Sequence, residues 1–175
     1  MASSGPNSPS SVVNNASIGT SAWSNPGNAT ASDNVDATNR PSGFVVVTNY
    51  LLATQFGFSI PTDATIDGVL VEVEAARSSA GSFQDSSVRL VVGGTISGND
   101  NSDNQLIGKS DTYYSWGGST DTWGLSLTPS DVNGSTFGFA WAAEQFDDPD
   151  RTLSVDHMRI TVYYTVGSTS SIIII

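Results

Sequence analysis

Apolar and polar residues alternate with a period of two along much of this chain, which is the pattern of a strand with one face in a core. The alternation is clearest in residues 50–60, 66–74 and 158–166. Shorter alternating or β-branched stretches predict further strands at 44–48, 87–92, 106–109, 122–127 and 136–143. Turns rich in Gly, Asn, Asp or Pro separate them. Seven or eight such strands predict an all-β fold, an antiparallel β-sandwich or a barrel.

The same alternation selects a core and one solvated face. In the strand 66–74, Glu72 and Glu74 share a face with Leu70, so we expect that face to reach water. The triplet Phe-Gly-Phe occurs at 56–58 and again at 137–139, where the glycine would allow two sheets to approach closely. The expected core residues are Phe56, Phe58, Ile66, Val69, Val71, Leu90, Phe137, Phe139, Ile160 and Val162.

The 175 residues suffice for one domain, and its two terminal segments differ in composition from the rest of the chain. Residues 1–20 are rich in Ser and Asn and predict an extended N-terminal arm, because they carry little apolar area to offset their ordering entropy. Residues 21–166 form the predicted sandwich. Residues 167–171 predict a flexible linker, followed by an apolar tip that we expect to dock on a partner by strand addition: Ile172, Ile173, Ile174 and Ile175.

Composition and charge exclude several function classes. Six Lys and Arg residues against 17 Asp and Glu give a net charge of −11, and the basic residues do not cluster. We therefore expect no nucleic-acid ligand, since that affinity rests on cations that neutralise phosphates. We also expect no membrane contact. The absence of cysteine excludes disulfides, thiolate metal sites and thiol catalysis.

Candidates for catalysis and for metal binding are few, and the chain is predicted to be neither an enzyme nor a cofactor protein. The sequence contains no Gly-x-Ser-x-Gly nucleophile turn with which the single histidine, His157, could act as a base. We therefore favour a structural or surface role for His157. Glu144, beside Trp141 and Asp147, is the best candidate for a glycosidase carboxylate, but no feature distinguishes it from an ordinary loop carboxylate. The acidic segments 99–104 and 147–150 could hold calcium, although solvated turns are favoured.

Aromatic residues near acidic and amide side chains suggest a different kind of site. Exposed Trp and Tyr can stack on a sugar ring while Asp and Asn bind its hydroxyls. The alternative is packing in the core and at the edges of the sandwich, which we favour because Trp123 alternates with Leu125 and Leu127. The candidates for glycan contact are Tyr113, Tyr114, Trp116 and Trp141.

Several motifs between residues 23 and 164 resemble those of small all-β structural proteins of tailed phages. They are Trp23-x-Asn-Pro-x-Asn-Ala29 with Ser32-Asp33, Phe56-Gly-Phe-Ser-Ile-Pro61 before Ala64-Thr-Ile, Trp123-Gly124, Leu127-Thr-Pro129 with Asp131-Val-Asn133, and Val155-Asp156 before residues 160–164. More distantly, the pattern is similar to jelly-roll modules of adhesins and carbohydrate-binding domains.

The resemblance implies a jelly roll on the exterior of a virion. It implies a non-enzymatic structural protein for capsid decoration, or one associated with a tail or fibre, which docks on the major capsid or tail protein lattice. Assembly as a homo-oligomer, with a trimer as one form, fits this setting. The alternative is an adhesin-like carbohydrate-binding module that attaches to a host glycan.

Overall fold

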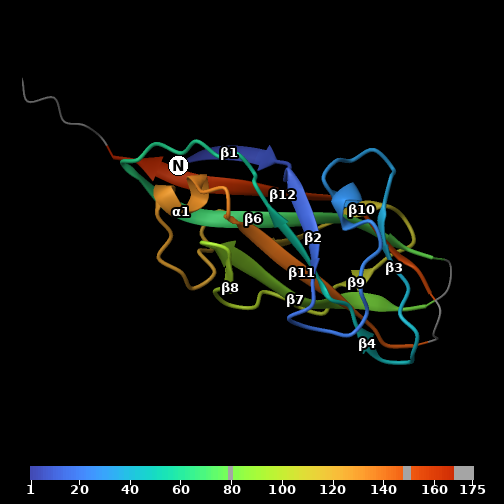
Figure 1. Ribbon diagram of the computed structural model, residues 1–175. Helices are drawn as coiled ribbons and strands as arrows, with labels where there is room; N and C mark the ends of the chain where they lie inside the picture. Colours follow the sequence, from blue (N-terminus) through green and yellow to red (C-terminus); the bar gives the residue numbers. More distant parts are fainter. Residues whose placement is uncertain (79–80, 148–150, 168–175) are drawn as a thin grey trace, which may run out of the picture.

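The computed structural model describes residues 1–78, 81–147 and 151–167, and it is a sandwich of two antiparallel β-sheets (Figure 1). The predicted β-sandwich is therefore confirmed. Within the described residues, no helix is long and apolar enough to cross a membrane. The predicted tip, Ile172–Ile175, lies outside the described residues.

The first sheet is built on two long strands. β6 (Ala64–Arg77) and β12 (Leu153–Val166) pair along almost their whole length. β10 (Thr112–Gly117) flanks β6, while β1 (Ala2–Asn7) and β3 (Ala37–Asn39) pair with successive parts of β12. We call this the five-stranded sheet.

The second sheet has seven strands. Its order is β2 (Ser11–Asn15), β5 (Tyr50–Thr54), β11 (Gly138–Gln145), β7 (Phe83–Val92) and β8 (Thr95–Ser97). The short strands β4 (Val46–Val47) and β9 (Leu106–Ile107) pair with β11 and β7. The described residues also form two single-turn helices, the 3₁₀ helix η1 (Pro26–Ala29) and α1 (Pro129–Asn133). The second of these begins with a capping box between Thr128 and Asp131.

All ten predicted core residues are buried between the sheets. The two Phe-Gly-Phe triplets face each other, with ring centroids 6.2 Å apart for Phe56 and Phe139 and 6.2 Å apart for Phe58 and Phe137. Their glycines have different roles from the expected sheet-to-sheet contact. A Cβ on Gly138 would overlap the backbone of β5 within the same sheet, whereas Gly57 has free space and a φ of 67°.

The N-terminal residues are part of the sandwich, which corrects the prediction of an arm. β1 is hydrogen-bonded to β12 and β2 to β5, so residues 2–7 and 11–15 are edge strands of the two sheets. Polar Ser and Asn residues can do this because backbone groups form the ladder whatever the side chain. Of these two strands, only Val12 is buried.

Several strand boundaries also differ from the predictions. Positive φ values at Gln55, Trp123 and Gly124 interrupt the extended backbone, so the strand from residue 50 ends at 54 and residues 122–127 form none. The predicted strand 106–109 shortens to the two residues of β9. The solvated face predicted for β6 is confirmed, with Leu70, Glu72 and Glu74 half-buried.

Candidate functional site on the outer face of the five-stranded sheet

The register of the five-stranded sheet gathers polar side chains on its outer face. Residues directly opposite each other in neighbouring strands share a face. Across β10, β6 and β12, the pairing therefore forms two consecutive rows. The first row is Tyr113, Glu74 and His157, and the second is Ser115, Glu72 and Arg159. We call this set the polar rows.

Arg159 is fixed by two neighbours. Its Nε donates to Glu72 Oε2 at 2.8 Å and its Nη2 donates to Oε1 at 2.9 Å, a bidentate pair. The guanidinium carbon also lies 3.5 Å from the centroid of the Tyr113 ring, in a cation–π contact. The hydrogen bonds to Glu72 raise the pKa of Arg159. The polar rows are thus held in place without a ligand, and one face of the Tyr113 ring is covered.

His157 links the N-terminal segment to the sheet. Its Nδ1 lies 2.9 Å from the Tyr113 hydroxyl and its Nε2 lies 2.9 Å from Ser8 Oγ. Burial lowers the pKa of this imidazole. The contact with Ser8 has the spacing of a nucleophile and its base, but Nδ1 meets a tyrosine hydroxyl where a serine hydrolase has a carboxylate. The arrangement is that of a structural histidine.

A hollow of about 310 Å³ continues the outer face beyond the polar rows. Ala76, two residues after Glu74 and paired with Ser154, lies in it. Asn34 borders it with a left-handed φ of 62°, a conformation that asparagine adopts more readily than most residues. All but one of the lining residues carry a hydroxyl, amide, carboxylate or guanidinium group: Asn34, Asp36, Ala76, Arg77, Ser78, Asp111, Thr152 and Ser154.

Carboxylates gather where the hollow meets the polar rows. Oxygen atoms of Glu74, Asp111 and Asp156 all lie within 4.8 Å of one another. We call these three residues the acidic corner. The pKa of Asp111 is raised, first by burial and then by the charges of Glu74, Asp156 and Asp36.

Of the aromatic residues proposed for glycan contact, two are in the core. Trp116 and Trp141 are 4% and 0% exposed, with ring centroids 6.4 Å apart, so neither can stack on a ligand. Alternation along β10 explains the burial of Trp116, because Trp116 and Tyr114 point inward while Tyr113 points outward. Tyr114 packs on the core and its hydroxyl accepts from the Gly108 amide at 2.7 Å. Tyr113 alone of the four belongs to the polar rows.

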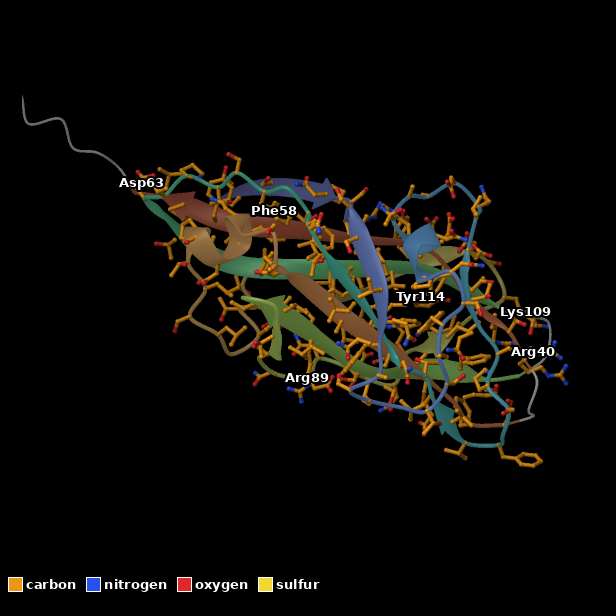
Figure 2. The ribbon with its side chains drawn as sticks, viewed as in Figure 1. Arg40, Phe58, Asp63, Arg89, Lys109 and Tyr114 are labelled. Carbon is orange, nitrogen blue, oxygen red and sulfur yellow. The ribbon has the colours of Figure 1, made fainter. Side chains whose placement is uncertain are left out.

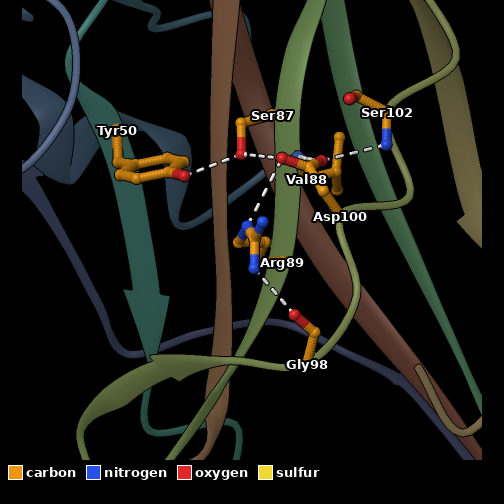
Figure 3. A network of polar contacts seen from close by, with 7 residues as sticks. All are labelled: Tyr50, Ser87, Val88, Arg89, Gly98, Asp100 and Ser102. Atoms are coloured by element: carbon orange, nitrogen blue, oxygen red, sulfur yellow. Dashed lines mark hydrogen bonds and ion pairs between the residues drawn. The ribbon is translucent and has the colours of Figure 1, made fainter. Parts of the chain in front are cut away.

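The acidic segment 99–104 is tied to the opposite sheet (Figure 3). The Asp100 carboxylate accepts from Ser87 Oγ at 2.6 Å, from the Val88 amide at 2.9 Å and from the Ser102 amide at 3.1 Å, and it pairs with Arg89. These bonds lower the pKa of Asp100 even though burial opposes them. Asp100 therefore anchors a loop.

The other acidic candidates also have internal partners. In the segment 147–150, Asp147 accepts from the Ser82 amide at 2.7 Å, and residues 148–150 lie outside the described residues. Glu144 accepts from Gln84 Nε2 at 3.2 Å.

The hollow and the acidic corner could not be found by motif, since their residues come from distant segments: the loop 34–36, β6, the loop before β10, and β12. The solvated face of β6 was the one sequence signal that pointed to them.

No family model matches this chain, and a search of curated proteins found no match. Solved structures with a related arrangement of strands include "BiXyn10A CBM1 APO", at 7% identity and a TM-score of 0.38, covering 89% of this chain and 99% of that one. An exo-β-agarase is similar at 10% identity and a TM-score of 0.41, over 86% of this chain and 23% of the agarase. Likenesses this distant carry no argument about function.

Proposed function

We propose that this chain is a non-catalytic carbohydrate-binding module that binds one sugar ring in the hollow over Ala76. The observation that carries the proposal is the hollow itself, where four segments bring hydroxyl, amide and carboxylate groups together beside the fixed polar rows. Its volume of about 310 Å³ is at the lower end of ligand pockets, a size that suits a single ring.

The lining matches the chemistry of a sugar better than that of other ligands. Each sugar hydroxyl both donates and accepts, so it needs neighbours such as the carboxylate of Asp36, the amide of Asn34 and the hydroxyl of Ser154. An anionic ligand would be repelled by the acidic corner. Because Arg159 covers one face of Tyr113, recognition relies on hydrogen bonds more than on ring stacking.

A glycan array followed by isothermal titration calorimetry tests this function. In the variant Ala76→Leu, a larger side chain enters the hollow from a half-buried position outside the core, and we expect binding to fall at least tenfold. The matched control is Thr54→Leu, at a half-buried position on the outer face of the seven-stranded sheet. Binding of no neutral glycan, or equal binding by Ala76→Leu and wild type, would refute the proposal.

A second candidate, a structural protein on the exterior of a phage particle, is supported by an exposed apolar group beside β4. Phe44 and Val45 are 72% and 67% exposed, and Phe146, which follows the β11 residue paired with β4, is also exposed. Large apolar side chains gathered at a surface favour a protein partner such as a capsid or tail lattice. Mass spectrometry of purified particles tests this location, and light scattering of the purified protein tests homo-oligomer formation.

A further inference from the structure

We propose that the acidic corner, formed by Glu74, Asp111 and Asp156, binds a calcium ion. Two oxygens that coordinate one Ca²⁺ at about 2.3–2.6 Å can be at most about 4.6–5.2 Å apart. The oxygens of these three residues lie within 4.8 Å of one another, so one ion between them can contact all three after small adjustments. The inference does not depend on glycan binding.

Burial of unpaired charge is the independent sign of a ligand. Oε2 of Glu74 has essentially no accessible surface and no hydrogen-bond partner among the described residues. Asp156 is only 2% exposed, and its carboxylate accepts a long bond of 3.3 Å from the Asp33 amide. A buried carboxylate oxygen that lacks a partner is destabilising. A cation at this point would give Glu74 Oε2 a partner and would add to the single long bond of Asp156.

Two nearby arginines, Arg159 and Arg77, are engaged elsewhere. Arg159 makes its bidentate pair with Glu72, and Arg77 donates from Nε to the Ile107 carbonyl at 2.9 Å and from Nη1 to the Ser78 carbonyl. The corner therefore keeps an excess of negative charge that a divalent ion can neutralise.

The donor set selects a hard cation over a transition metal. All three side chains offer carboxylate oxygens, the ligands that Ca²⁺ prefers. The adjacent His157 cannot contribute nitrogen without losing its contacts to Tyr113 and Ser8, and the chain has no cysteine. Calcium takes six to eight oxygens, and the hollow beside the corner gives water access to the remaining positions.

A β-bulge brings Asp156 into the corner. The register between β12 and β6 shifts between Val155 and His157, so Asp156 is the extra residue in β12. Bulges change the direction of a side chain next to binding sites. Here the bulge allows Asp156 and His157, although adjacent in the chain, both to lie near Glu74.

The test measures the ion alone, with the full chain stripped of metal by a chelator and no sugar present. Titration calorimetry with CaCl₂ should give one site per chain, and calcium should raise the melting temperature. Tb³⁺ should bind at the same site with luminescence sensitised by Tyr113, and Ca²⁺ should displace it. Since no sugar enters the experiment, its failure would leave the glycan proposal standing, and failure of the glycan array would leave this one standing.

Two variants of equal charge change make the test specific. Asp111→Asn alters an exposed residue, so the fold is retained, and calcium affinity should fall at least tenfold. Asp63→Asn is the matched control, an exposed aspartate at the opposite end of the sandwich from Lys109, which precedes Asp111 by two residues (Figure 2). The control should bind as wild type. Absence of a one-to-one site at millimolar calcium, equal weakening by both variants, or tighter binding of Zn²⁺ than of Ca²⁺ would overturn the proposal.

Discussion

Substitution of the glycine in the second Phe-Gly-Phe triplet, Gly138→Ala, should be among the most destabilising single-methyl changes in this protein. A Cβ built on Gly138 lies 2.9 Å from the carbonyl carbon of Ala53 and closer still to its oxygen. Both atoms belong to the β5 backbone, which cannot rotate away as a side chain can. Either β5 or β11 must therefore shift, and the ladder between them would be disturbed.

The size of the effect follows from what the shift disrupts. Adding a methylene to a packed interior typically costs about 1–3 kcal/mol, and a clash with backbone belongs at the upper end, so we expect a loss of about 3 kcal/mol. The flanking rings of Phe137 and Phe139 pack against Phe58 and Phe56 and would move with β11. For a domain of this length, about 3 kcal/mol corresponds to a fall in melting temperature of about 6–12 °C.

Gly57→Ala in the first triplet is the matched control. Nothing lies within 4 Å of a Cβ at this position, but φ is 67°. A left-handed alanine costs about 1–2 kcal/mol, and the lower entropy of the unfolded chain offsets about 0.4–1 kcal/mol of that. Urea denaturation and differential scanning calorimetry should therefore show a clearly smaller loss than for Gly138→Ala. If the two variants lost the same stability, or Gly57→Ala lost more, the assigned role of Gly138 would be wrong.

Three further predictions concern the N-terminus, a buried carboxylate and a buried indole. Deleting residues 1–9 should lower the melting temperature of the isolated domain, because β1 and the Ser8 contact to His157 are lost; an unchanged value would restore the arm interpretation. Burial raises the pKa of Asp85, so the folded state keeps a proton that the unfolded state loses as pH rises above 3.8. Wild-type stability measured relative to Asp85→Asn by urea denaturation should thus fall as pH rises through that window and then level off, whereas a constant difference would contradict the shift. Trp123→Phe removes the 2.9 Å bond from Nε1 to the Val69 carbonyl and should cost about 1–3 kcal/mol by the same assay, without changing calcium or glycan affinity.

Local pattern was sufficient for the fold class and the core. Alternation in β6 and β12 reflects a direct physical constraint, because successive side chains of a strand point to opposite faces. The same rule correctly placed Glu72 and Glu74 on a solvated face. It failed at Trp123, where a left-handed backbone occurs at a residue that gives no local warning of it.

The polar N-terminal strands show why composition misled. β1 and β2 gain stability mainly from backbone pairing with β12 and β5, and a partner's free edge cannot be read from the polar segment itself. Of the aromatic candidates, Trp116 and Tyr113 are three residues apart on β10, yet one is in the core and the other on the surface. Which face of the strand turns inward depends on the sheet that packs behind it.

Periodicity and composition are local properties of the chain, and they were enough to predict an all-β sandwich, its apolar core and its excess of negative charge. The candidate sites depend on contacts between distant segments. Strand register across β10, β6 and β12 aligned the polar rows, and a bulge at Asp156 joined it to Glu74 and Asp111. Those contacts link residues tens of positions apart. The packing of the whole sandwich fixes strand register and bulges, so neither can be predicted from any single segment.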